Sequence, residues 1–148
     1  MVFDKAIRPL QDSDWDLLLK LDTKVFGVSR ESVLRKLAQS SLRVLVLKKN
    51  TGDLCGYGML RAGAKADYLG PVVSIWRDGT AALINALFST SKKNSFFWDI
   101  PDQADDARAL AQKMGFILQR PLIRMFLGDN THPGVPQHQY AIADPAMG

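Results

Sequence analysis

The sequence predicts one α/β domain with a mixed sheet covered by helices. Three strand-like segments follow one another in the middle of the chain with only short turns between them, which favours antiparallel pairing. Beyond them, helical periodicity alternates with strand-like runs, which adds covering helices and a parallel connection. The 148 residues are 47% hydrophobic, and this suits a single packed domain spanning 1–148.

The first part of the chain predicts a short strand and two helices. The strand is expected over 6–10. Asp12 or Ser13 offers a side-chain oxygen to cap the next helix, and Gly27 ends that helix because glycine accepts a left-handed backbone. A second short helix is expected to begin after Ser29.

The central strands are the clearest elements. Runs over 42–48 and 54–60 flank an Asn-Thr-Gly turn at 50–52, so they predict a hairpin. A third strand is expected over 67–74, interrupted by Gly70-Pro71.

The second half alternates helices and strands. The expected segments are a helix from an Asp78 cap to about Thr90, a strand over 95–100, a helix from Asp102 to Gly115, and a strand over 119–127. The proline-rich stretch over 128–148 is expected to form an extended arm of the same domain. The predicted order is therefore β-α-α-β-β-β-α-β-α-β.

Composition excludes several classes. The net charge is +4 and no run of bases exceeds a pair, which argues against nucleic acid as a partner. No apolar run is long enough to cross a membrane. The single cysteine, Cys55, excludes an internal disulfide and favours the cytoplasm. The histidines His132 and His138 lie in the arm without cysteine partners, so no metal site is expected.

Motifs in the chain resemble those of GNAT N-acetyltransferases. The element order agrees, residues 55–61 look like the third strand of that fold, and Gly115-Phe116 looks like the end of its last helix. The match extends to the C-terminal domain of bacterial two-domain GNAT proteins, here expected to stand alone. The motifs that carry it, in order, are Phe26-Gly27, Gly56-Tyr57-Gly58, Arg61-Ala62-Gly63, Tyr68 to Val73, Asp99-Ile100-Pro101, Gly115-Phe116, Arg124-Met125 and Tyr140 to Ala143.

The resemblance implies transfer of an acetyl group from acetyl-CoA to a small amine. In GNAT domains the fourth and fifth strands separate and the amide arm of the cofactor lies between them. Val72, Val73 and Ser74 are then expected to pair with that arm. Pro71 has no N–H and suits a strand that is partly unpaired. A bulge or edge strand without a ligand explains the same proline.

The resemblance also places a pyrophosphate at the helix that follows. Arg77, Gly79, Thr80 and Ala81 are expected to hold it through backbone N–H groups and the helix dipole. Trp76 stands where this family usually has Gln or Arg. An ordinary helix cap at Asp78, without phosphate, is the alternative.

The sequence motifs indicate catalytic groups less clearly than they indicate the fold. Ala111 occupies the position of the tyrosine that often serves as general acid in this family. Asp99 and Tyr68 are expected to handle the amine, although Asp99 could instead bond backbone groups at the end of its strand.

Arg61 and Arg124 are expected on neighbouring parts of the sheet, where paired guanidinium groups would bind a carboxylate or phosphate of the substrate. Surface ion pairs would use the same residues. Two functions therefore stay open: an acetyltransferase, or a GNAT-fold module that binds a small molecule or protein without transfer. An apolar face left by a missing sister domain would predict a homodimer.

Overall fold

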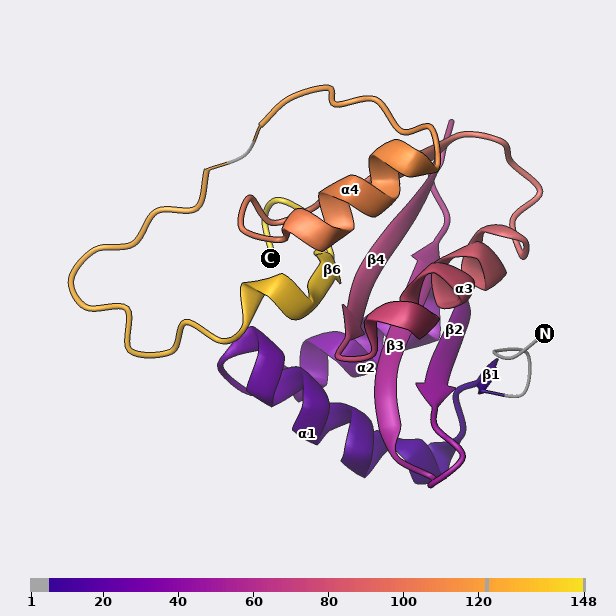
Figure 1. The fold of residues 1–148 in the computed structure, drawn as a ribbon, viewed down its shortest axis with the longest axis horizontal. Coiled ribbons are helices and arrows are strands. Elements are labelled where there is room, and N and C mark those ends of the chain that lie inside the picture. Colours follow the sequence, from indigo (N-terminus) through magenta and orange to yellow (C-terminus); the bar gives the residue numbers. More distant parts are fainter. Residues whose placement is uncertain (1–5, 122, 148) are drawn as a thin grey trace.

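The computed structural model describes residues 6–121 and 123–147, and it forms a mixed α/β sheet structure (Figure 1). The strands are β1 (Ile7–Pro9), β2 (Ser41–Lys48), β3 (Leu54–Arg61), β4 (Asp67–Ser74), β5 (Phe96–Trp98) and β6 (Gln139–Ala141). The helices are α1 (Trp15–Phe26), α2 (Glu31–Ser40), α3 (Arg77–Phe88) and α4 (Asp105–Lys113), with short 3-10 turns η1 (Asp12–Asp14) and η2 (Pro136–His138). The predicted fold class is confirmed.

The sheet runs in the order β1-β2-β3-β4-β5. Its first three pairings are antiparallel and the pairing of β4 with β5 is parallel. The predicted hairpin of β2 and β3 is therefore confirmed, and β4 has the predicted bounds.

Two apolar layers hold the helices against opposite faces of the sheet. One buried cluster contains Leu83, Ile84 and Leu87 of α3 with Ala107 of α4. The other contains Leu18 and Val25 of α1 with Leu34 of α2. Side chains alternate between the two faces of a strand, so neighbouring residues of β2 pack in different layers. Leu45 and Leu47 lie in the first cluster, and Val46 lies in the second.

One edge of β4 is shared by two strands. β5 pairs with the first part of β4, from Asp67 to Leu69. Beyond the cis Gly70–Pro71 bond, the same edge pairs antiparallel with β6, opposite Val72 and Val73. The predicted separation of β4 from β5 is therefore present, but the C-terminal part of the chain lies in the opening.

The C-terminal third departs most from expectation. The described residues of 119–127 belong to no strand, so the strand predicted there is wrong; Leu122 lies outside the described residues. The last strand is β6, inside the stretch that was expected to form only an extended arm. A strand needs a partner edge, and the edge of β4 receives Gln139–Ala141 instead.

Three helix starts also differ from the prediction. The N-cap of α3 is Trp76 rather than Asp78, and that of α2 is Arg30 rather than Ser29. α4 begins at Asp105, later than Asp102. None of these three caps makes a side-chain hydrogen bond to its helix, so packing rather than capping fixes the starts.

Candidate functional site

The second half of β4 carries the residues expected to pair with a cofactor arm. Val72 lies opposite Ala141 and Val73 lies opposite Gln139 in the pairing with β6. Both valines are fully buried. The edge that the sequence analysis left open for a ligand is therefore covered by the chain itself.

The start of α3 carries the residues expected near phosphate. Arg77 is exposed, and its side chain forms a 3.3 Å ion pair with Asp106 at the start of α4. The Gly79 N–H donates to the Trp76 carbonyl over 3.1 Å. A Cβ at Gly79 would lie 3.0 Å from the Leu47 side chain, so this glycine faces the core.

Two buried hydroxyls join the end of β4 to α3. The Thr80 hydroxyl lies 2.8 Å from the Ser74 hydroxyl and 2.9 Å from the Trp76 carbonyl. Thr80 and Ser74 are both almost completely buried. Ala81 follows and is partly exposed. Among the four residues expected to hold the pyrophosphate, Arg77 is the one that carries an exposed positive charge.

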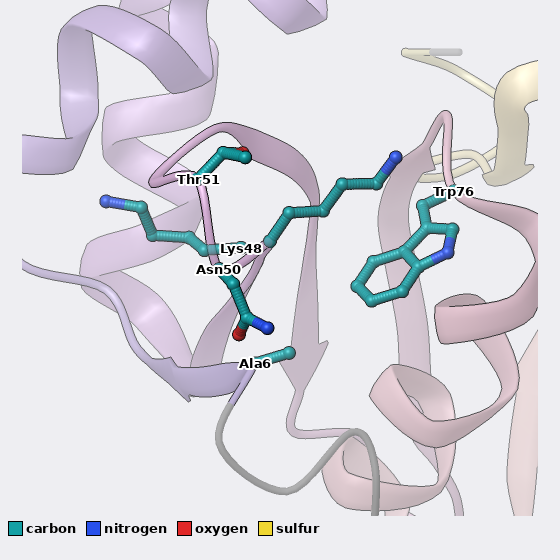
Figure 2. A pocket seen from close by; sticks show the side chains of 6 residues that line it. Ala6, Lys48, Asn50, Thr51 and Trp76 are labelled. Atoms are coloured by element: carbon teal, nitrogen blue, oxygen red, sulfur yellow. The ribbon is translucent and has the colours of Figure 1, made fainter.

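The Trp76 side chain lies beside the turn that joins β2 to β3 (Figure 2). It lines a shallow cavity of about 320 Å³ together with Ala6, Lys48, Lys49, Asn50 and Thr51. The Lys49 ammonium is 5.3 Å from the centre of the indole ring, a cation–π distance. The ring therefore occupies the β2 side of α3.

A polar cluster forms where Arg61 of β3 and Tyr68 of β4 lie near Asp99, the residue that follows β5. The Arg61 guanidinium lies 5.7 Å from the centre of the Tyr68 ring and donates to the Gly70 carbonyl over 2.9 Å. Burial lowers the pKa of Arg61, while the charges of Asp144 and Asp99 oppose that change. The structure thus brings together three predicted site residues.

Asp144 completes this cluster and was missed by sequence reasoning. It follows β6 in the stretch expected to be an arm, so no sequence signal placed it near Arg61. The Arg61 side chain also donates to the Ala143 carbonyl, and the Ile142 N–H donates to the Asp99 carbonyl over 2.9 Å. The C-terminal segment is therefore bound to the cluster through its backbone.

Arg124 does not join Arg61. It lies in the exposed segment between α4 and η2 and belongs to no strand. The expectation that both arginines occupy neighbouring parts of the sheet is wrong, because the strand that would have carried Arg124 does not form.

Tyr140 is a second residue that sequence reasoning missed. The Trp98 indole N–H donates to its carbonyl over 2.6 Å, and its hydroxyl lies near the Thr80 side chain. Burial raises the pKa of Tyr140, and the nearby Asp106 carboxylate adds to that change. Tyr140 thus connects β6 to the start of α3.

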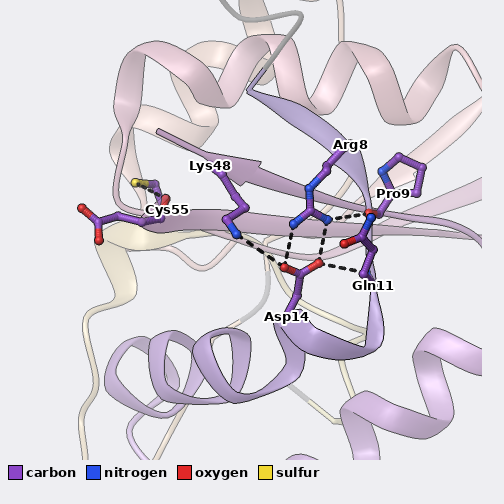
Figure 3. Close-up of polar contacts among 7 residues, drawn as sticks. Arg8, Pro9, Gln11, Asp14, Lys48 and Cys55 are labelled. Atoms are coloured by element: carbon purple, nitrogen blue, oxygen red, sulfur yellow. Dashed lines mark hydrogen bonds and ion pairs between the residues drawn. The ribbon is translucent and has the colours of Figure 1, made fainter. Parts of the chain in front are cut away.

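Away from the opening, a charged cluster joins β1 to η1, the turn that precedes α1 (Figure 3). The Arg8 guanidinium donates two hydrogen bonds to the buried Asp14 carboxylate, over 2.7 and 2.8 Å. The Gln11 N–H donates over 2.9 Å, and Lys48 lies 3.7 Å away. The Arg8 hydrogen bonds lower the pKa of Asp14 to about 2. The partners of Asp14 are Arg8 of β1, Gln11 before η1 and Lys48 of β2. This cluster therefore stabilises the structure.

Comparison with known proteins decides the family. A family model of the GNAT acetyltransferase domain matches residues 18–141. This chain belongs to the GNAT acetyltransferase family. It is 25% identical over 146 residues to YitH of Bacillus subtilis (strain 168), which is described as an uncharacterized N-acetyltransferase.

Solved structures show the same GNAT fold. A putative acetyltransferase from Pyrococcus horikoshii aligns with 97% of this chain at a TM-score of 0.76 and 21% identity. The aminoglycoside 6'-N-acetyltransferase AAC(6')-Ih from Acinetobacter baumannii aligns with 84% of this chain and 98% of its own, at a TM-score of 0.64 and 14% identity.

The GNAT chain described here spans about half the length of its larger relatives. It covers 51% of YitH and 46% of the Pyrococcus protein, with 98% and 97% of its own residues aligned. Among residues 6–121 and 123–147, no helix has the length and apolar character needed to span a bilayer.

Proposed function

We propose that this GNAT domain is an acyltransferase that moves acetyl from acetyl-CoA to a small amine. Family membership is the observation that carries the proposal. The separation of β4 from β5 after Leu69 supports it, because that is where this fold opens its sheet. A related fold, AAC(6')-Iy, was solved with a bisubstrate analogue that joins CoA to monomethyl-acetylneamine, at a TM-score of 0.64 and 13% identity.

The start of α3 fits an anionic group better than β4 fits an amide arm. The helix N-terminus has no side-chain cap, and Arg77 adds an exposed cation beside Gly79, Thr80 and Ala81. In contrast, β6 covers Val72 and Val73, and the Ser74 hydroxyl is bonded to Thr80. With β6 in place, the edge of β4 does not fit the cofactor arm.

The amine would bind at the polar cluster. Asp99 and Asp144 supply carboxylates that attract a protonated amine, and the Tyr68 ring offers a face to a cation. Arg61 would hold an anionic part of the substrate. Tyr57 is excluded as a proton donor to substrate because it is fully buried and its hydroxyl donates to Asp22.

A turnover assay tests this proposal. Release of the CoA thiol would be followed with acetyl-CoA and a panel of small amines. We expect amine-dependent release that falls in an Asp99→Asn variant. Absence of release with every amine, together with absence of acetyl-CoA binding, would contradict the proposal.

The second candidate function is a GNAT-fold module without transfer chemistry. The occupied edge of β4 favours it, as does Ala111 at the position where a catalytic tyrosine is common in the family. Such a module would serve as the partner of another acetyltransferase domain. Amine-dependent release of the CoA thiol by the isolated chain separates the two candidates.

We also propose that the chain forms a homodimer in the cytoplasm. Large apolar side chains cluster on the segment between α4 and η2, where about two-thirds or more of each is exposed. They are Ile117, Leu118, Ile123, Met125, Phe126 and Leu127. Such a concentration of exposed apolar side chains marks an interaction surface. Cys55 is buried and free, which suits a reducing compartment.

A further inference from the structure

The C-terminal strap, residues 139–143, lies on β4 in the manner of a bound peptide. Its strand β6 is only three residues long and pairs with Val72 and Val73. An extended chain that adds to an open sheet edge is held by main-chain hydrogen bonds, as in β-augmentation by peptide ligands. The strap therefore uses the same backbone groups that any extended amide-bearing ligand would need.

Side chains fasten both ends of the strap. At one end, the Tyr140 carbonyl accepts a hydrogen bond from the Trp98 indole N–H, and the Tyr140 hydroxyl lies near Thr80. At the other end, the Ile142 N–H donates to Asp99 and the Ala143 carbonyl accepts from Arg61. The strap thus contacts the residues proposed for the cofactor and those proposed for the amine.

The strap fits tightly against the cis Gly70–Pro71 step. A Cβ on Gly70 would lie 2.1 Å from the Ile142 carbonyl oxygen. Gly70 also has a φ of +136°, a conformation that favours glycine. A side chain at this position would therefore push the strap away from β4.

The connection to the rest of the chain allows the strap to leave. The described residues between α4 and η2 form no helix or strand, and they loop away from the sheet (Figure 1). Just before the strap, the Val135 N–H donates to the Val25 carbonyl over 2.7 Å, which anchors the chain to α1. Gly134, with a φ of +65°, adjoins this anchor. Release of the strap therefore requires no unwinding of a helix.

We propose that the strap is an autoinhibitory segment that competes with acyl-CoA for the edge of β4. The inference rests on the proposed acyl-CoA-dependent function. The free chain is closed by its own C-terminal residues, and acyl-CoA binds only to the fraction in which they have left. The apparent affinity for acyl-CoA equals the intrinsic affinity multiplied by this open fraction. A change that loosens the strap raises the open fraction and therefore strengthens binding.

Hydrogen exchange measured by mass spectrometry tests the competition in the full chain. Peptides covering 139–143 and 70–74 would be followed with and without millimolar acetyl-CoA. We expect exchange to increase in 139–143 on binding, while 70–74 stays protected because the ligand replaces the strap. Bound acetyl-CoA with unchanged protection of 139–143 would overturn the strap proposal and leave the proposed function intact.

Two variants that loosen the strap complete the test. Gly70→Ala places a methyl group against Ile142, and Tyr140→Phe removes the hydroxyl near Thr80 while keeping the ring. The matched control is Gly52→Ala, which also has positive φ, at +89°, but meets nothing within 4 Å.

We expect acetyl-CoA to bind roughly tenfold tighter to the loosened variants, because the competent fraction rises, and the control to match the wild type. A variant in which 139–143 exchanges freely but acetyl-CoA still does not bind would overturn both the strap proposal and the proposed function.

Discussion

The Tyr57 hydroxyl donates a 2.5 Å hydrogen bond to the Asp22 carboxylate, joining β3 to α1 across 35 positions of sequence. The same carboxylate accepts two hydrogen bonds of 2.9 Å from Arg30, just before α2. Asp22 and Tyr57 are buried, and burial raises the pKa of Tyr57 well above its usual value. The hydroxyl therefore stays protonated and ties the α1–α2 layer to the sheet.

Replacing Tyr57 with Phe removes this hydrogen bond, so the buried Asp22–Arg30 ion pair loses one of its polar partners. We expect the free energy of unfolding to fall by about 1–3 kcal/mol, the range for losing a buried bond to a charged group. Urea denaturation measures the change. Tyr68→Phe is the matched control, because Tyr68 is more than one-third exposed. Equal losses in the two variants would contradict a special role for the Tyr57 bond.

The pKa of Asp14 predicts a stability change in acid. Its value of about 2 in the folded chain lies below the ordinary 3.8, so the ionised carboxylate stabilises the fold above about pH 4. That contribution, roughly 2 kcal/mol by the size of the shift, is lost as the pH falls from about 4 toward 2. Urea titrations across this range measure it, and Asp14→Asn should remove this part of the pH dependence. An unchanged pH profile in Asp14→Asn would contradict the assignment.

Arg77 is the sharpest probe of the phosphate end of the site. Its side chain is 77% exposed, so Arg77→Glu should leave the fold intact. We expect this change to weaken acetyl-CoA binding by roughly tenfold or more, since it replaces a cation beside a phosphate with a repelling charge. The matched control is Lys36→Glu, an equal charge change at an exposed position of α2. Equal binding by both variants would show that the phosphate lies elsewhere.

A glutamate at Gly79 is a poor probe of the phosphate end of the site. The sequence places Gly79 on a phosphate loop, but its Cβ position faces Leu47 and Trp76. Gly79→Glu would therefore disturb the core, and loss of binding would not locate the ligand.

The exposed apolar segment predicts self-association. Met125 and Phe126 are 84% and 66% exposed. We expect the wild type to sediment as a dimer and Met125→Glu to shift it toward monomer, because a buried charge without a partner is costly at an interface. Lys113→Glu, on α4 outside the segment, is the control. A monomeric wild type at high micromolar concentration would contradict the dimer.

The central strands were predictable because their signals are local. The turn at 50–52 fixes the β2–β3 hairpin, and the third strand predicted beside it coincides with β4. The sequence also identified Asp99, Tyr68 and Arg61, which the fold brings into one cluster. These features depend on neighbouring residues and on the order of elements in a known family.

The C-terminal region was not predictable in the same way. The segment 119–127 has a strand-like composition, but a strand also requires an available edge, and that is a property of the whole fold. Gln139–Ala141 is too short to be recognised as a strand, yet it adjoins the open edge of β4. Tyr140 and Asp144 were missed for the same reason.

The contact between Val72 and Ala141 tests the account most directly. These residues are partners in the β4–β6 register. Nuclear Overhauser contacts between their backbone protons would be followed while acetyl-CoA is added to the full chain. We predict clear contacts in the free chain that disappear as acetyl-CoA saturates it. Contacts that persist at saturation, or an absence of any binding even when the strap is loosened, would contradict the account.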